Sequence, residues 1–132
     1  MKFFVDNNIS PKAARALNCL VEPHHSVVHL KDKFAAETPD IEWMEKLAEE
    51  PGWIIVSGDT NISRNPHEIN AWKTAGHTIF FLTHGWIHLG RFEQASKLLA
   101  IFPRIIELAE KAKRSSAFMV PVRGAKIEKL VD

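Results

Sequence analysis

The sequence is most informative at residues 53–59, which read WIIVSGD. Four apolar residues follow one another without the polar alternation of a half-exposed strand, as is typical of a parallel strand covered on both faces. The strand is predicted to end at Gly58-Asp59. Because a parallel strand of this kind needs helices on both sides, this stretch indicates an α/β fold.

The rest of the chain alternates in the same way. Further strands are predicted at residues 2–5, 27–30, 78–82 and 117–122, and helices at 11–20, from 39, from 66 and at 91–113. Each helix shows a start signal or an apolar stripe, with Leu17 and Leu20 on the stripe of the first. Pro103 is expected to break or kink the last helix, and Pro121 to make the last strand an edge strand. We expect one domain, residues 1–132, with a mostly parallel sheet of four or five strands.

Composition excludes several classes of protein. The 132 residues are 45% hydrophobic and 25% charged, which predicts an ordinary folded core. Cys19 is the only cysteine, so it has no intramolecular disulfide partner, and we expect it to be a small core residue of a reducing compartment. No apolar run approaches the roughly 20 residues of a membrane span. We therefore expect a soluble cytoplasmic protein with no membrane partner.

Charge is divided unevenly along the chain. Residues 1–60 hold ten acids and six bases, whereas residues 61–132 hold six acids and eleven bases. An acidic centre beside a basic surface suits an enzyme that binds cations in a cleft and a polyanion around it, although such segregation is weak support on its own.

Three aspartates are predicted at one edge of the sheet. Asp6 and Asp59 follow two strands directly, and Asp40 stands at the start of a helix that follows a third. Taken alone, Asp40 suits a helix N-terminus and Asp59 a turn, so only their common position favours a shared function. Carboxylates about 4 Å apart repel by roughly 4 kcal/mol at an effective dielectric near 20. Such a cluster needs protons or cations, and Mg²⁺ or Mn²⁺ suits oxygen ligands that also hold phosphate.

These segments together resemble the PIN-like nuclease family, in particular its short toxin-like members related to the VapC ribonucleases. The matching segments are residues 3–10 (FFVDNNIS), 27–32 (VVHLKD), 40–43 (DIEW) and 54–61 (IIVSGDTN). The resemblance covers residues 1 to about 82 well, and the remainder only by the order of its elements.

The resemblance implies a three-layer α/β/α domain and a Mg²⁺- or Mn²⁺-dependent ribonuclease. Asp6, Asp40 and Asp59 would be the metal ligands, and a metal-activated water would attack the RNA phosphate. The family often has glutamate where this chain has Asp40, and a fourth acid where it has Asn61. Asn61 is nevertheless expected at the catalytic site, binding metal or orienting water. RNA, a cognate antitoxin and a second copy of the chain are the expected partners.

Several other residues are secondary candidates. Asp32 is a reserve ligand because it follows a strand, although a solvated acid between two lysines is the simpler interpretation. Asn8 either lines the pocket beside the aspartates or only forms the turn after the first strand. Glu68 is interpreted as a helix-capping acid rather than a ligand. The candidates for phosphate contact are Arg64, which ranks first, followed by Lys12 and Arg15.

The histidines give a weaker hypothesis. Residues 24–29 and 84–88 each place histidines at spacings that could bind zinc. Gly85 disfavours a helix that would bring His84 and His88 to one side, so scattered surface histidines are the preferred interpretation.

Two rival functions remain open. One is a nuclease-derived binding or regulatory module that keeps the carboxylates without turnover. The other is a receiver-like domain that accepts phosphate on one aspartate. Metal-dependent RNA cleavage that Asp6→Asn abolishes separates the nuclease from the first rival, and a small phosphodonor assay tests the second.

Overall fold

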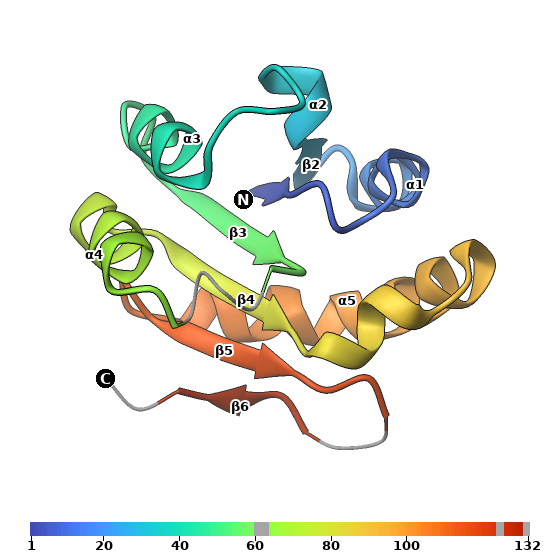
Figure 1. The fold of residues 1–132 in the computed structure, drawn as a ribbon. Helices are drawn as coiled ribbons and strands as arrows, with labels where there is room; N and C mark the ends of the chain where they lie inside the picture. The colour runs from blue at the N-terminus through green and yellow to red at the C-terminus, as the bar shows by residue number, and fades with distance from the viewer. Residues whose placement is uncertain (60–63, 124–125, 131–132) are drawn as a thin grey trace.

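The structure is a computed structural model that describes residues 1–59, 64–123 and 126–130. Its strands and helices alternate as predicted (Figure 1), but the sheet has a sixth strand beyond the four or five expected. In chain order they are β1 (Lys2–Val5), α1 (Pro11–Val21), β2 (Ser26–His29), α2 (Leu30–Lys33), α3 (Asp40–Leu47), β3 (Trp53–Ser57), α4 (Pro66–Ala75), β4 (Thr78–Leu82), the 3₁₀ helix η2 (His84–His88), α5 (Arg91–Lys111), β5 (Ala117–Val120) and β6 (Glu128–Lys129).

The strands form one sheet in the order β2-β1-β3-β4-β5-β6. The first five are parallel, and only β6 runs antiparallel, as its arrow in Figure 1 shows. Because β1 and β3 are neighbours, with Val5 level with Val56, the chain leaves both strands at the same edge. The residues that follow β1 and β3 are therefore brought together.

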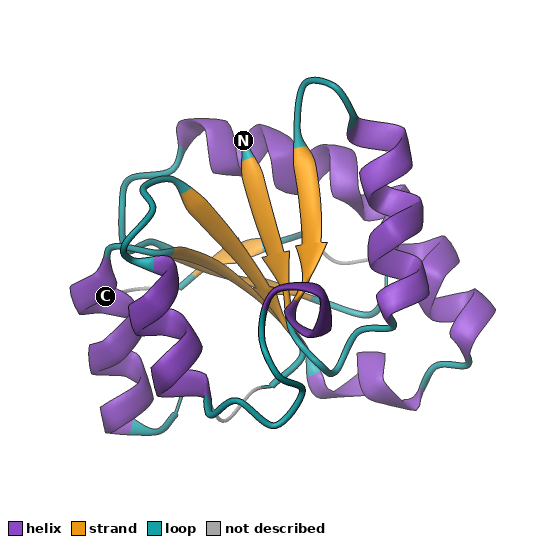
Figure 2. Cartoon of the chain, turned by 90° about the horizontal axis from the view of Figure 1, so that it is seen from above, coloured by secondary structure: helices purple, strands orange, loops and turns teal. Residues whose placement is uncertain are grey.

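Helices cover both faces of the sheet, which makes the predicted α/β/α fold (Figure 2). One core packs residues of α1 and α5 against Phe3, Val5 and Val56. The other core packs residues of α3 and α4 against Phe4 and Ile55. All five residues of β3 are buried, so the absence of polar alternation in WIIVS correctly predicted a strand covered on both sides.

Some sequence-based expectations were wrong. Of the two outcomes expected at Pro103, the break is wrong, because α5 continues through it from Arg91 to Lys111. The kink stays a prediction. The last parallel strand is not an edge strand, because β6 pairs with β5 after the chain turns back beyond Pro121. Cys19 and Leu20 are exposed, Leu20 by 71%, so neither belongs to the core.

None of the helices in the described part of the chain combines the length and the apolar character needed to cross a membrane.

Candidate active site

Asp6 is the most deeply buried of the three predicted aspartates. It follows β1, is 3% exposed, and its Oδ1 accepts hydrogen bonds from the backbone N–H groups of Asn8 and Gly58, each at 3.2 Å. The hydroxyl of Ser57 donates to its Oδ2. Burial nevertheless outweighs these donors and raises the pKa of Asp6 to about 6. A carboxyl group held this way is oriented before any ligand binds.

Ser57 links the two strand ends. Its hydroxyl donates to Asp6, and its Oγ accepts the backbone N–H of Asp59 at 3.0 Å. Ser57 is fully buried and Asp6 is 3% exposed, so water is not available to replace the bond between them. The residue therefore fixes the spacing between the first and third aspartates.

Replacing Ser57 by alanine is expected to lower stability by about 1–3 kcal/mol, because it removes a donor from a buried carboxyl group and an acceptor from the Asp59 N–H. Urea unfolding measures the change. The control is Thr74→Ala, which removes an exposed hydroxyl and should change stability by less than about 0.5 kcal/mol. Equal stability of the Ser57 variant and the wild type would show that this bridge contributes nothing.

Gly58 allows the turns after β1 and β3 to pack closely. A Cβ added to Gly58 would lie 2.6 Å from the Cβ of Asn8, too close for two carbon atoms. Asn8 thus has a structural role, because it packs against Gly58 and its backbone N–H donates to Asp6. Its side chain is exposed.

Gly58→Ala is expected to cost about 1–3 kcal/mol and to displace Asp59, because the contact with Asn8 is made by short side-chain atoms that cannot move away. Asn8→Gly removes the opposing Cβ. The double variant should therefore lose less stability than the sum of the two single variants, which a thermodynamic cycle measures. Additive losses would contradict the proposed clash.

Asp40 begins α3 on the opposite side of the site from α1. Its Oδ1 accepts a hydrogen bond from Trp43 Nε1 at 3.0 Å, and its carboxyl group also bonds to that of Asp59. Burial, followed by the negative charge of Asp59, raises the pKa of Asp40 to about 7. A hydrogen bond between two carboxyl groups needs a shared proton, which is the chemical alternative to a bound cation.

Asp59 lies at the centre of this cluster. Its charge acts on Asp6, on Asp40 and on Glu68, and raises the pKa of each. Among the described residues, no three acidic, histidine or cysteine side chains are placed to hold one metal ion together. The predicted aspartates thus share one edge of the sheet and interact in pairs through Asp59. Their common role as metal ligands stays a prediction.

Glu68 is a fourth acidic residue that the sequence analysis placed only at a helix cap. Asn65 is the N-cap of α4, as the capping-box spacing predicts, and its Oδ1 accepts the His67 N–H at 2.9 Å. Glu68 Oε2 is buried without a hydrogen-bond partner among the described residues. Burial and then the charge of Asp59 raise the Glu68 pKa. The sequence signal was available: Glu68, like Asp40, lies in the first turn of a helix that starts at this edge.

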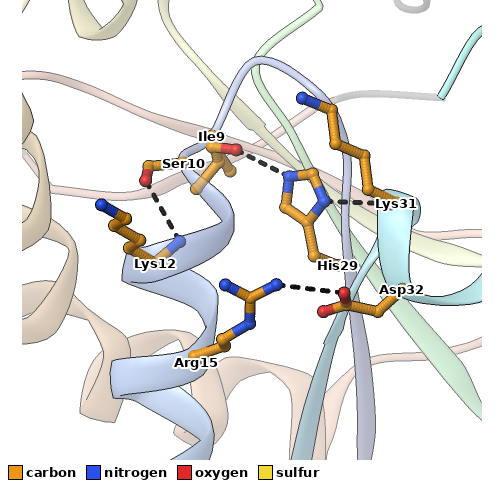
Figure 3. Close-up of polar contacts among 7 residues, drawn as sticks. All are labelled: Ile9, Ser10, Lys12, Arg15, His29, Lys31 and Asp32. Atoms are coloured by element: carbon orange, nitrogen blue, oxygen red, sulfur yellow. Dashed lines mark hydrogen bonds and ion pairs between the residues drawn. The ribbon is translucent and has the colours of Figure 1, made fainter.

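Basic residues lie on α1 and α2, and Figure 3 shows Lys12, Arg15 and Lys31 among them. Arg15 of α1 turns towards Asp32 of α2 and contacts its carboxylate at 3.2 Å (Figure 3). Asp32 is therefore paired with Arg15 and its side chain is 42% exposed, which favours the interpretation as a solvated acid over the role of a reserve ligand. Lys12 and Arg64 are exposed, near the starts of α1 and α4. Asn61 lies outside the described residues.

His29 supports the turn that carries Asp6. It is 1% exposed, its Nδ1 accepts the Lys31 backbone N–H at 3.0 Å, and its Nε2 lies 2.7 Å from Ile9 O (Figure 3). Since Nδ1 is an acceptor, Nε2 carries the proton and donates to Ile9. Burial lowers the pKa of His29, so the neutral ring is favoured. This histidine is a buried structural residue rather than a scattered surface one.

A mostly parallel sheet with acidic side chains at its carboxyl edge defines a class of α/β proteins that bind ligands beyond their strand ends. The sequence model described as "PIN like domain" matches residues 1–84. The chain therefore belongs to the PIN-like domain family, whose members are generally nucleases that typically use divalent metal ions. The match spans Asp6, Asp40, Asp59 and Glu68. No curated protein and no solved structure matches the chain.

Proposed function

We propose that the protein is a metal-dependent endoribonuclease whose active site is built on Asp6, Asp40, Asp59 and Glu68. The observation that carries this proposal is the position of Asp59, which interacts with the other three carboxyl groups from the end of β3. Four acids drawn together at the carboxyl edge cost stability unless protons or cations compensate them. Such a cost is typical of a functional site.

The donor chemistry suits a hard divalent cation. Carboxylate oxygens are the ligands that Mg²⁺ and Mn²⁺ prefer. Glu68 Oε2 is buried and without a partner among the described residues, as expected for an oxygen that a ligand would satisfy. We therefore assign Mg²⁺ or Mn²⁺ to this site, with Asp6, Asp40 and Asp59 as ligands. Glu68 is the fourth acid of the cluster, although the family's fourth acid falls at Asn61 in this chain.

Each side chain has a separate task. Ser57 and Gly58 hold the Asp6 carboxyl group in one orientation, and Trp43 does the same for Asp40. Asp40 and Asp59 would exchange their shared proton for the cation. When bound, a divalent cation supplies an activated water and neutralises charge on the phosphate. Asn61 stays a prediction for orienting that water.

RNA is the proposed substrate, and the exposed Arg64 and Lys12 are the proposed phosphate contacts. Arg15 ranks below them because its guanidinium is paired with Asp32. We further propose a cytoplasmic toxin that a cognate antitoxin neutralises, and a homodimer as its assembly. These roles rest on the family resemblance to toxin-like members.

The test is cleavage of a labelled single-stranded RNA with Mn²⁺, Mg²⁺ or EDTA. The proposal predicts cleavage with either metal, none with EDTA, and loss of cleavage in Asp6→Asn. Asp32→Asn, a neighbouring acid outside the cluster, should cleave normally. RNA binding without cleavage would favour the non-catalytic binding module instead.

A further inference from the structure

A second group of metal-binding side chains lies on η2, outside the carboxylate cluster. His84 and His88 are both exposed, and their Nε2 atoms are 3.1 Å apart. Their ring centres are 4.8 Å apart, and the ring planes are inclined by 78°. Contrary to the sequence-based expectation, Gly85 does not prevent these histidines from meeting.

The distances match two ligands of one ion. Zinc–nitrogen bonds of about 2.05 Å and a nitrogen separation of 3.1 Å give an angle of about 98° at the metal, close to the tetrahedral and octahedral values. An imidazole nitrogen lies about 1.15 Å from its ring centre, so this arrangement places the ring centres about 4.8 Å apart. The observed separation is 4.8 Å.

The two Nε2 atoms also lie within hydrogen-bond distance of each other, but their ring centres are closer than a straight bond would place them. A straight N–H···N bond places both ring centres on the line through the nitrogens, which would separate them by about 5.4 Å. The shorter observed distance shows that the rings meet the nitrogen–nitrogen line at an angle. An inclination of this kind is compatible with two lone pairs that converge on one ion.

The segment between the two histidines is held rigidly. Trp86 is 2% exposed, and its Nε1 donates to Val120 O at 3.0 Å. Gln94 Nε2 donates to Trp86 O at 3.2 Å. A Cβ on Gly85 would lie 2.9 Å from Val122 Cγ1, so η2 packs directly against the segment after β5. The two imidazoles are therefore presented by a fixed support, which lowers the entropy cost of binding.

We propose that His84 and His88 form a binding site for Zn²⁺ or a similar borderline divalent cation. Imidazole nitrogen favours such cations, whereas the carboxylate cluster favours harder ones. No third acidic, histidine or cysteine side chain within the described residues completes the site. The remaining coordination positions are therefore open to water or to a donor from another molecule.

The experiment is calorimetric titration of Zn²⁺ into full-length Asp59→Asn protein, in which the carboxylate cluster is disabled. The expected result is binding of one zinc ion that weakens at least tenfold in Asp59→Asn/His84→Ala and equally in Asp59→Asn/His88→Ala. Mg²⁺ titrated into the same protein should give no binding at these residues. Both histidines are exposed, so the variants should melt at the parent temperature.

The controls are His24→Ala and His25→Ala in the same background. His24 is an exposed histidine elsewhere. His25 Nδ1 lies 2.9 Å from the amino-terminal nitrogen, which makes a second close pair of nitrogen atoms within the described residues. Neither substitution should change the zinc binding that His84→Ala removes. If zinc binding is absent, or if it survives both η2 substitutions, the site is disproved. Because the cluster is already disabled, failure here leaves the proposed nuclease function untouched.

Discussion

Asp59→Asn is expected to abolish RNA cleavage while raising the stability of the metal-free protein. The substitution removes the charge that acts on Asp6, Asp40 and Glu68, which should stabilise the fold by about 1–2 kcal/mol at pH 8. Loss of residues that only orient metal ligands already costs about 10–100-fold, so loss of a ligand should reduce cleavage by at least about 100-fold. Thermal melts with and without Mn²⁺, together with an RNA cleavage assay, measure both effects.

The same melts should show a much smaller Mn²⁺-induced rise in melting temperature, because stabilisation by a ligand follows its affinity for the folded state. Asp32→Asn is the matched control, an acid near the same edge whose partner is Arg15. It should retain the full Mn²⁺ effect. An Asp59 variant that melts below the wild type and responds normally to Mn²⁺ would refute the assignment of Asp59 to the cluster.

The second large effect is a loss of metal-free stability as pH rises. Asp6 has a folded-state pKa of about 6 against an ordinary value of 3.8, because burial favours its neutral form. Between these values the folded protein binds more protons than the unfolded chain, so the free energy of unfolding decreases with increasing pH. The Asp6 contribution is about 3 kcal/mol, lost between roughly pH 4 and pH 7. Asp40, with a pKa of about 7, acts in the same direction.

Asp6→Asn isolates this contribution. His29 and His77 have lowered pKa values and act in the opposite direction, since their stabilising effect is lost as pH falls below the ordinary histidine value. The difference between the wild-type and Asp6→Asn stabilities cancels them. From pH 4 to pH 7, the wild type should lose stability relative to Asp6→Asn. Urea unfolding at several pH values measures this change. A difference that does not change with pH would contradict the raised pKa.

The sequence predicted the parallel sheet well because its strands lack polar alternation. Predictions from the sequence failed where contacts between distant segments determine the local structure. Pro103 stays inside α5 because it is exposed, while Phe102 and Ile105 on either side are buried and hold the helix. β6 is only two residues long and both are charged, so no local pattern predicts it, and it forms by pairing with β5.

From the positions of acidic residues after strands and at a helix start, the sequence correctly predicted that Asp6, Asp40 and Asp59 lie at one edge of the sheet. How deeply each acidic side chain is buried, and which group it contacts, could not be predicted from the sequence. Only the structure separates Asp32, paired with Arg15, from Glu68, whose Oε2 is buried beside the cluster. The approach of His84 to His88 depends on the packing of η2 against the segment after β5, a contact between segments more than 30 residues apart in the sequence.

The short strand β6 also affects how copies of this protein meet in concentrated solution. An outermost strand with free backbone groups can recruit a strand from another molecule and start fibrous aggregates. At the edge opposite β2, the outermost strand offers only Glu128 and Lys129, both charged and exposed, and it covers the apolar β5. Cutting the chain before residue 128 would expose the backbone edge of β5 and should increase aggregation relative to the full chain, as light scattering measures.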